Sequence, residues 1–327
     1  MSQNQSFSVS VVIPAYNAEA TIERAIESVL HQTRPPEEII VVDDGSTDRT
    51  AEKVQQYGGR VRYLFQEHRG ANEARNCAIE QAQGNWIALL DADDEWLPKK
   101  LEVQHSLLER NPHLVWAYGN YHVRKPDGSC QEAHDRETAR KLLGQGDYFP
   151  DFLEAYAQDI PVHTITMLIR RDALMQVGMF LPGQILNHDP DVALRLAYQY
   201  PGVGYSPEPL AIHYFGRAEG ITQRHWRMAE EKTAFLLRHL DLSARFGKRK
   251  AFEICAAALL QKWIRDLLAE EPNAQVLKMT KHFRRFLPVR LRAEAWLRCR
   301  FPRMMPPVID WYFKMKNRLR KGHSNGI

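Results

Sequence analysis

Two hydrophobic periods alternate along the first hundred residues, and this alternation constrains the possible folds more than any other feature of the chain. In some segments apolar residues follow one another or alternate, as in strands, and between these segments they recur every three or four residues, as in helices. The order predicts an α/β fold with a mainly parallel central sheet that helices cover on both faces. The predicted strands are 8–14, 38–44, 60–66 and 85–91, and the predicted helices are 22–30, 46–57, 71–83 and one from Pro98 to about Arg110.

Turn and cap residues mark the ends of these elements. Asn17 is a candidate N-cap for the first helix, Ser46 opens the second, and Gly84 ends the third. The periodicity weakens after the fourth helix. There we expect an irregular excursion over 120–160, a strand over 163–171, a helix over 189–200 with an acidic cap, extended chain over 203–214 and helices from residue 226 onward.

Charge divides the chain into two regions. Residues 226–327 hold 23 Lys and Arg against nine Asp and Glu, whereas residues 1–225 hold 21 against 31. Such an asymmetry predicts two parts with different partners. We therefore expect an α/β domain over 1–225 and a basic, mostly helical C-terminal region over 226–327.

Some classes of protein are not expected from the sequence. The N-terminus lacks a basic segment followed by an apolar one, and no run of about 18 apolar residues occurs, so we expect neither a secretory signal nor a transmembrane helix. The four cysteines are far apart and form no Cys-x-x-Cys pair. This spacing argues against a disulfide framework or a zinc site and fits a reducing compartment, so the expected location is cytoplasmic.

Four carboxylates, those of Asp91, Asp93, Asp94 and Glu95, follow the fourth predicted strand. Like charges this close repel one another, so a positively charged partner is expected. In extended chain, positions 91 and 93 point to the same side, where two carboxylates make a hard oxygen site for Mg²⁺ or Mn²⁺. The alternative is an acidic turn that only caps the next helix.

Polar clusters also follow the first two strands, as "PAYN" and "DDGSTD". In open α/β sheets ligands bind beyond the carboxyl ends of the strands, so the three clusters predict one crevice. We assign residues 45–48 to a turn and a helix cap. Asp43 and Asp44 point to opposite sides, so one of them can accept a hydrogen bond from a nucleobase or a ribose. The glycine patterns of dinucleotide sites and P-loops and the Gly-x-Ser-x-Gly elbow are absent from the sequence.

Five segments, in order along residues 8–215, resemble the family 2 glycosyltransferases, which have the GT-A fold. The segments are "SVVIPAYNAEATIERAIESVLHQT", "EIIVVDDGSTDRT", "GANEARNCAIEQAQGNWIALLDADD", "NHDPDVALRLA" and "YSPEPLAIHY". The resemblance implies an inverting enzyme that uses a nucleotide-diphospho-sugar, with a UDP-sugar favoured, and Mg²⁺ or Mn²⁺. The metal would neutralise the leaving diphosphate, and a carboxylate would take the proton of the acceptor hydroxyl.

The resemblance also implies roles for single residues. Asp189 would be the catalytic base and Asp93 the metal ligand. His188 stands where the family has Glu, which makes His188 a rival base, and Asp191 could share the role of Asp189 as base or helix cap. The implied nucleotide-sugar-binding residues are Pro14, Ala15, Tyr16, Asp44, Arg75 and Asp91.

Two further features are weaker. His213 is interpreted as a packed or loop histidine rather than a ligand. "TQRHW" (222–226) has the wrong spacing for the Gln-x-x-Arg-Trp signature of processive polysaccharide synthases, so we expect a single-addition enzyme acting on a glycan or lipid-linked acceptor in polysaccharide or glycolipid synthesis.

The basic segment 281–321 holds thirteen Lys and Arg and two acids, interleaved with aromatic residues. Such a segment suits an anionic membrane surface at the cytoplasmic face, or packs its apolar side on the α/β domain. No nucleic-acid motif accompanies it, so nucleic acid is not an expected partner.

Two alternatives to a glycosyltransferase remain. One is a non-catalytic, membrane-associated glycan-assembly protein with the same fold. The other is a sugar-nucleotide nucleotidyltransferase, which would need a glycine-rich loop after the first strand.

Overall fold

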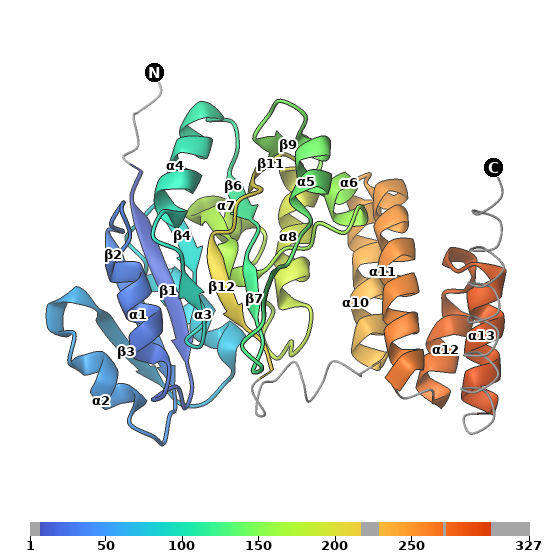
Figure 1. Cartoon of the computed structure of the whole chain (residues 1–327), viewed down its shortest axis with the longest axis horizontal. Coiled ribbons are helices and arrows are strands. Elements are labelled where there is room, and N and C mark those ends of the chain that lie inside the picture. The colour runs from blue at the N-terminus through green and yellow to red at the C-terminus, as the bar shows by residue number, and fades with distance from the viewer. Residues whose placement is uncertain (1–6, 217–228, 271–272, 302–327) are drawn as a thin grey trace, which may run out of the picture. The chain divides into compact units, whose positions relative to one another are not determined.

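Four strand–helix repeats open the chain in the computed structural model, which describes residues 7–216, 229–270 and 273–301 (Figure 1). β1 pairs in parallel with both β2 and β4, and β2 pairs in parallel with β3. The parallel arrangement predicted for this part is therefore confirmed. The elements are β1 (Val9–Ala15), α1 (Ile22–Leu30), β2 (Glu38–Asp44), α2 (Thr50–Gln55), β3 (Arg62–Gln66), α3 (Ala71–Gln81), β4 (Trp86–Leu89) and α4 (Lys100–Arg110).

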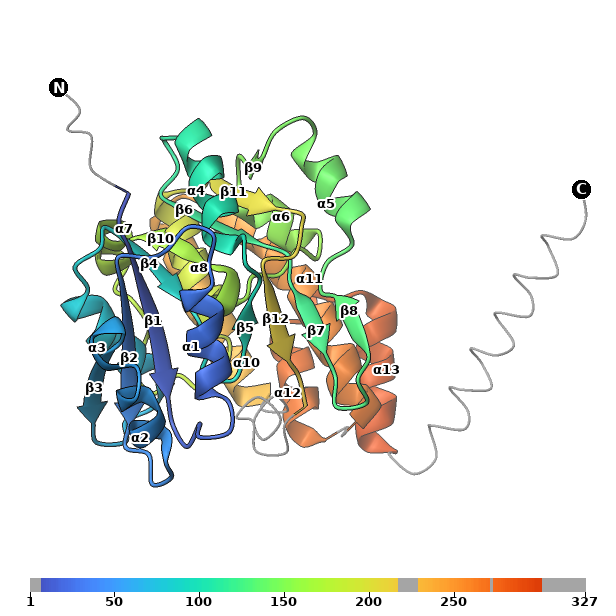
Figure 2. The same cartoon turned by 60° about the vertical axis from the view of Figure 1, so that its left-hand side comes forward.

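Helices cover both faces of this sheet (Figure 2). Val9, Val11 and Ile13 of β1 belong to one buried cluster with the apolar side of α1, because alternate residues of a strand point to the same face. Val12 points to the other face and is also fully buried, and α3 contacts β1 and β2. A strand buried on both faces reads as a continuous apolar run, which is the pattern in the sequence.

The rest of the sheet is mixed. β10 (Leu168–Arg170) lies between β4 and β6 (Trp116–Gly119) and runs antiparallel to both. β6 pairs in parallel with β11 (Val203–Ser206), whose other neighbour is the antiparallel edge strand β9 (Tyr148–Phe149). The order is β3-β2-β1-β4-β10-β6-β11-β9.

The excursion predicted as irregular over 120–160 is instead structured. It contains β7 (His122–Arg124), β8 (Cys130–Glu132), α5 (Arg136–Leu143), β9 and α6 (Phe152–Ala157). β7 and β8 form a second sheet with β5 (Glu95–Trp96) and β12 (Ala211–Tyr214), in the order β5-β12-β7-β8. These strands are short and their partners lie far away in the sequence, so no local hydrophobic period predicts them.

Several predicted boundaries are wrong. α1 begins after Thr21, so Asn17 is not its N-cap. α2 begins at Thr50 rather than at Ser46, whose hydroxyl instead accepts a hydrogen bond from the backbone N–H of Asn17. The predicted strand 163–171 is a 3₁₀ turn, η2 (Thr164–Thr166), followed by the short β10.

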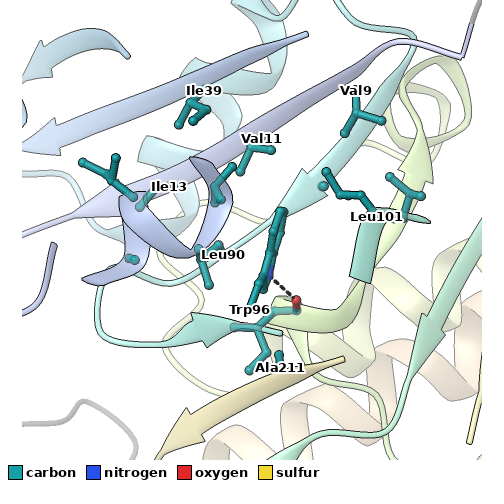
Figure 3. Close-up of a cluster of buried hydrophobic side chains, with 14 of the residues drawn as sticks. Val9, Val11, Ile13, Ile39, Leu90, Trp96, Leu101 and Ala211 are labelled. Atoms are coloured by element: carbon teal, nitrogen blue, oxygen red, sulfur yellow. Dashed lines mark hydrogen bonds between the residues drawn. The ribbon is translucent and has the colours of Figure 1, made fainter. Parts of the chain in front are cut away.

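Trp96 connects the buried cluster of β1 and α1 to the 3₁₀ turn η2 (Figure 3). Its ring is buried in the cluster beside Val11 and Leu101, and its indole N–H donates a hydrogen bond to the carbonyl oxygen of Ile165 at 2.8 Å. A buried indole N–H without a partner would destabilise the fold, so this bond fixes the position of η2. Two helices follow, α7 (Arg171–Gln176) and α8 (His188–Gln199).

The C-terminal extension is helical where it is described. Its elements are α10 (Ala229–Arg245), α11 (Arg249–Glu270), α12 (Ala274–His282), η3 (Arg284–Phe286) and α13 (Val289–Arg300). The chain divides into two compact units, Met1–His225 with Leu242–Lys248, and Trp226–Asp241 with Arg249–Ile327. Within the described residues no helix combines the length and the apolar character that a bilayer crossing needs. The motif at 222–226 and residues 302–321 of the basic segment lie outside the described residues.

Candidate functional site

The strand directions bring the polar clusters to one edge of the large sheet. β1, β2 and β4 are parallel, so their carboxyl ends lie at the same edge. β10 is antiparallel to β4 and to β6, so β10 begins at this edge and β6 ends there. Segments 90–95, 119–121 and 163–166 therefore meet at the edge where open α/β sheets bind ligands.

Three predicted nucleoside-binding residues lie at the end of β1. Pro14 and Ala15 are buried as the last residues of the strand. Tyr16 is 49% exposed, and its ring lies 4.2 Å, centroid to centroid, from the ring of His68. The paired rings offer an aromatic surface beside the strand end.

Asp44, at the end of β2, is buried and accepts hydrogen bonds on both oxygens. Oδ1 accepts from the amide of Gln66 at 2.6 Å and from the backbone N–H of Arg69 at 2.9 Å. Oδ2 accepts from the backbone N–H of Gly70 at 2.8 Å and lies 2.9 Å from the His68 ring. A carboxylate offers about four acceptor positions, so a nucleobase N–H at Asp44 has to displace Gln66 or His68.

Asp43 has different partners, as expected for the neighbouring residue of a strand. It accepts hydrogen bonds at 2.8 Å from the backbone N–H of Ser46 and from the hydroxyl of Tyr63. Gly45 follows with φ +76°, and a Cβ there would lie 2.9 Å from the His68 backbone nitrogen. The predicted turn at Gly45 therefore depends on glycine.

Asp91 is paired with the buried Arg75 of α3. Arg75 Nη2 donates to Asp91 Oδ1 at 2.6 Å, and its Nη1 donates to Asn72. Burial raises the pKa of Asp91, but the positive charges of Arg75 and His163 outweigh burial and hold this pKa below its ordinary value. Arg75 is therefore the positive partner of Asp91, one member of the acidic cluster.

The acidic cluster forms a turn rather than extended chain, so the geometry predicted for Asp91 and Asp93 is wrong. The backbone N–H of Asp94 donates to the carbonyl oxygen of Asp91 at 3.1 Å. Asp93 is partly exposed, and its carbonyl oxygen accepts a hydrogen bond from Arg24. The Arg24 guanidinium lies 3.8 Å from the ring centroid of Tyr214, which ties this turn to β12.

Asp94 and two histidines form a cluster that sequence reasoning missed. Asp94 is buried and accepts a hydrogen bond from the backbone N–H of Tyr214 at 2.9 Å, and His213 Nδ1 lies 3.1 Å from its Oδ2. The ring of His163 lies 4.6 Å from that of His213. One side-chain ligand atom from each of Asp94, His163 and His213 lies within 4.8 Å of the others. A packed histidine explains the ring contacts of His213 but not its ion pair with Asp94.

The surroundings shift the pKa values of the two histidines in opposite directions. Burial lowers the pKa of His213, but the hydrogen bond that its Nδ1 donates to Asp94 and the charges of Asp94, Asp91 and Asp93 outweigh burial and raise this pKa. Burial and the neighbouring His213 lower the pKa of His163. In the absence of a metal, the surroundings therefore favour the charged form of His213 and the neutral form of His163.

Asp189 lies in the first turn of α8 and is not the helix cap, which is Asn187. Thr164 Oγ1 donates a hydrogen bond to Asp189 Oδ1, and His188 Nε2 lies 3.0 Å from the same oxygen. Thr164 belongs to the segment that meets the acidic turn at the sheet edge, so Asp189 lies at the same edge as Asp91. The structure thus brings together Asp91, Arg75 and Asp189 from distant segments.

Asp191 cannot share the role of base. It is fully buried and pairs with Arg195, one helical turn later, at 2.7 Å. Arg195 also donates hydrogen bonds to the carbonyl oxygens of Val177 and Met179. Asp191 therefore fastens α8 to the segment after α7.

Comparisons with known proteins agree on one family. The model of the family described as "Glycosyl transferase family 2" matches residues 10–178. The chain is 42% identical over 239 residues to the putative teichuronic acid biosynthesis glycosyltransferase TuaG of Bacillus subtilis (strain 168), which covers 71% of this chain and 88% of that protein.

A shorter match is to the Escherichia coli UDP-Glc:alpha-D-GlcNAc-diphosphoundecaprenol beta-1,3-glucosyltransferase WfgD. It has 44% identity over 117 residues, 35% of this chain and 46% of the E. coli protein, so less than half of that enzyme is spanned. Among solved structures, S. aureus TarS 1-349 in complex with UDP-GlcNAc superposes with a TM-score of 0.65 at 18% identity, over 88% of this chain and 83% of that one. The likeness shows a shared fold, GT-A. On the family match and the TuaG alignment together, the chain belongs to glycosyl transferase family 2 and is a glycosyltransferase.

Proposed function

We propose that this glycosyltransferase moves a sugar from a UDP-sugar to a hydroxyl group of a glycan or lipid-linked acceptor, with inversion at the anomeric carbon. The observation that carries the proposal is the hydrogen bond from Thr164 to Asp189, which holds Asp189 at the sheet edge where Asp91 and Arg75 lie. The printed names of two relatives supply the substrate classes: WfgD takes UDP-Glc and an undecaprenol-linked acceptor, and TuaG is named for teichuronic acid synthesis.

In the proposed reaction Asp189 acts as the general base. The acceptor oxygen bonds to the anomeric carbon as the bond from this carbon to the diphosphate oxygen breaks, and the hydroxyl proton passes to the Asp189 carboxylate. The nucleoside diphosphate leaves from the opposite face, so a single displacement inverts the configuration. Tyr16 and His68 would stack on the nucleobase, with Pro14, Ala15 and Asp44 beside them. Asp91 would bind the ribose, and Arg75 would hold Asp91 in place.

The residues of the acidic turn fit Mg²⁺ or Mn²⁺. A metal-bound histidine donates its second ring N–H to a carboxylate in most sites, and His213 Nδ1 pairs with Asp94 in this way. Both oxygens of Asp94 already take hydrogen bonds, so Asp94 orients His213 rather than binding the metal. Asp93 and His213 Nε2 would be the protein ligands. When bound, the metal neutralises the diphosphate charge.

Replacing Asp93 by Ala should abolish metal-dependent use of the donor. The purified protein is given a panel of UDP-, GDP- and dTDP-sugars with Mn²⁺, with Mg²⁺ and with EDTA, and release of the nucleoside diphosphate is measured. We expect release from a UDP-sugar in the metal samples, its loss with EDTA, and a fall of at least about 100-fold in Asp93→Ala, as for removal of one electrostatic contact to developing charge.

Asp172→Ala is the matched control, because the Asp172 side chain is 70% exposed on α7. It should release the diphosphate as the unchanged protein does. Equal release in Asp93→Ala and in the control would contradict the metal assignment. Release from a GDP- or dTDP-sugar alone would correct the donor.

We also propose that α13 binds the anionic membrane surface on which a lipid-linked acceptor lies. One side of α13 is exposed over three turns and combines apolar and basic side chains, a pattern that suits the membrane interface. Val289 is 71% exposed and Trp296 49%. We call this set the α13 stripe: Val289, Arg290, Ala293, Trp296 and Arg300.

The double variant Arg290→Gln/Arg300→Gln should weaken binding to vesicles of phosphatidylcholine and phosphatidylglycerol by roughly 30-fold, since each arginine near such a surface contributes about 1 kcal/mol. Co-sedimentation measures the change. The control is Arg49→Gln/Lys125→Gln, two exposed cations of the α/β unit. Equal loss in both pairs, or equal binding to vesicles of phosphatidylcholine alone, would contradict a role of the α13 stripe.

A further inference from the structure

The carboxylate of Asp189 is held through one of its two oxygens. Thr164 Oγ1 donates a hydrogen bond to Oδ1, and His188 Nε2 lies 3.0 Å from the same atom. Within the described part of the chain, every hydrogen bond and ion pair of Asp189 falls on Oδ1. Oδ2 is thereby the oxygen left to meet a substrate.

Regular helix geometry alone does not bring the side chains of His188 and Asp189 together. Neighbouring residues of a helix do not face each other. Here Asn187 has a left-handed backbone, with φ +59° and ψ +26°, and His188 follows as the first residue of α8. The ring of His188 is 26% exposed and the carboxylate of Asp189 15%, so the pair is accessible only in part.

The neighbours of Asp189 favour its charged form. Burial raises the pKa of Asp189, but the charge and hydrogen bond of His188, with contributions from His163 and Thr164, outweigh burial and hold this pKa well below its ordinary value. The carboxylate is therefore kept in the charged form, which is the form that accepts a proton.

We propose that His188 is a positioning residue for the transfer reaction: it fixes Asp189 through Oδ1 and so directs Oδ2 to the acceptor hydroxyl. The inference rests on the proposed function, since it names the residue that orients the same base.

The first test compares kcat and KM for transfer in two variants of His188. His188→Gln, whose amide N–H can still reach Oδ1, should keep most of kcat. His188→Ala removes the contact and should lower kcat by roughly 10- to 100-fold, the cost of a misplaced catalytic group, while KM for the donor stays the same.

His31→Ala serves as the comparison, because it truncates an exposed histidine at the end of α1. It should transfer sugar as the unchanged protein does. An unchanged kcat in His188→Ala, or equal losses of kcat in His188→Ala and His188→Gln, would overturn the assignment to His188.

A second test needs no turnover. The crystal structures of His188→Ala and His188→Gln are compared with that of the unchanged protein. The Asp189 carboxylate should turn away from its position in His188→Ala and keep it in His188→Gln. An unmoved carboxylate in His188→Ala overturns the inference. Absence of transfer with every donor, together with a turned carboxylate in His188→Ala, counts against the proposed function and leaves the pairing of His188 with Asp189 intact.

Discussion

Replacing Asp189 by Asn should lower kcat for sugar transfer by about 10²–10⁴-fold, the contribution of a positioned general base. The substitution keeps the size of the side chain and an oxygen that can accept the hydrogen bond from Thr164, so the local structure should persist. The residues proposed to bind the nucleotide lie at strand ends, away from α8, so UDP binding should not change. Initial rates with a saturating acceptor and calorimetric titration with UDP measure the two effects.

The comparison variant for this loss is Asp172→Asn, which changes an exposed carboxylate on α7. It should transfer sugar at the rate of the unchanged protein. A rate in Asp189→Asn within about ten-fold of that control would remove Asp189 as the base, because general-base catalysis accounts for more than that factor. Loss of UDP binding in Asp189→Asn would instead show that the residue acts on the donor.

The first half of the sheet was predictable because its signals are local. In β1, β2 and β4 each buried strand is a continuous apolar run, and each helix between them repeats within its own sequence. β6 was missed, and β10 was misplaced because its three residues are too few to show a period. The antiparallel direction of β10 depends on its partners β4 and β6, which are far away in the sequence.

The candidate site likewise contains residues whose position was predictable from the sequence and residues whose position was not. Asp44 and Asp91 directly follow local apolar runs, so their position at the strand ends could be read from the sequence. His163 and His213 come from segments fifty residues apart, and only the pairing of β12 with β5 and β7 brings His213 to the acidic turn. The contact of Thr164 with Asp189 likewise depends on the position of η2, which the hydrogen bond from the buried Trp96 holds in place. No spacing rule could supply these contacts.

Asp191 illustrates a signal that was present but ambiguous. An acid four residues before an arginine on a predicted helix favours an ion pair, and Asp191 and Arg195 have this spacing. The same position in the first turn also suits a cap or a base. Burial decides between these roles, and burial is a property of the folded chain: Asp191 is fully buried and Arg195 is 8% exposed.

Replacing Asp191 by Ala should therefore lower the free energy of unfolding by about 3–5 kcal/mol, because removal of one partner leaves the other charge buried without compensation. Arg195 also holds the carbonyl oxygens of Val177 and Met179, so the segment before α8 should loosen with it. For a domain of this size the melting temperature should fall by roughly 6–20 °C. Urea unfolding followed by circular dichroism measures the free energy.

Glu137 and Lys141 of α5 form the matched control, because they have the same helical spacing at 2.7 Å but are 76% and 74% exposed. Glu137→Ala should cost no more than about 0.5 kcal/mol, since water screens an exposed pair. Adding Arg195→Met to Asp191→Ala should recover part of the loss, as the uncompensated charge is then gone. If the double variant is as unstable as Asp191→Ala alone, the cost arises from the cavity and not from the charge. Equal losses in Asp191→Ala and Glu137→Ala would show that burial adds nothing to the strength of the Asp191–Arg195 pair.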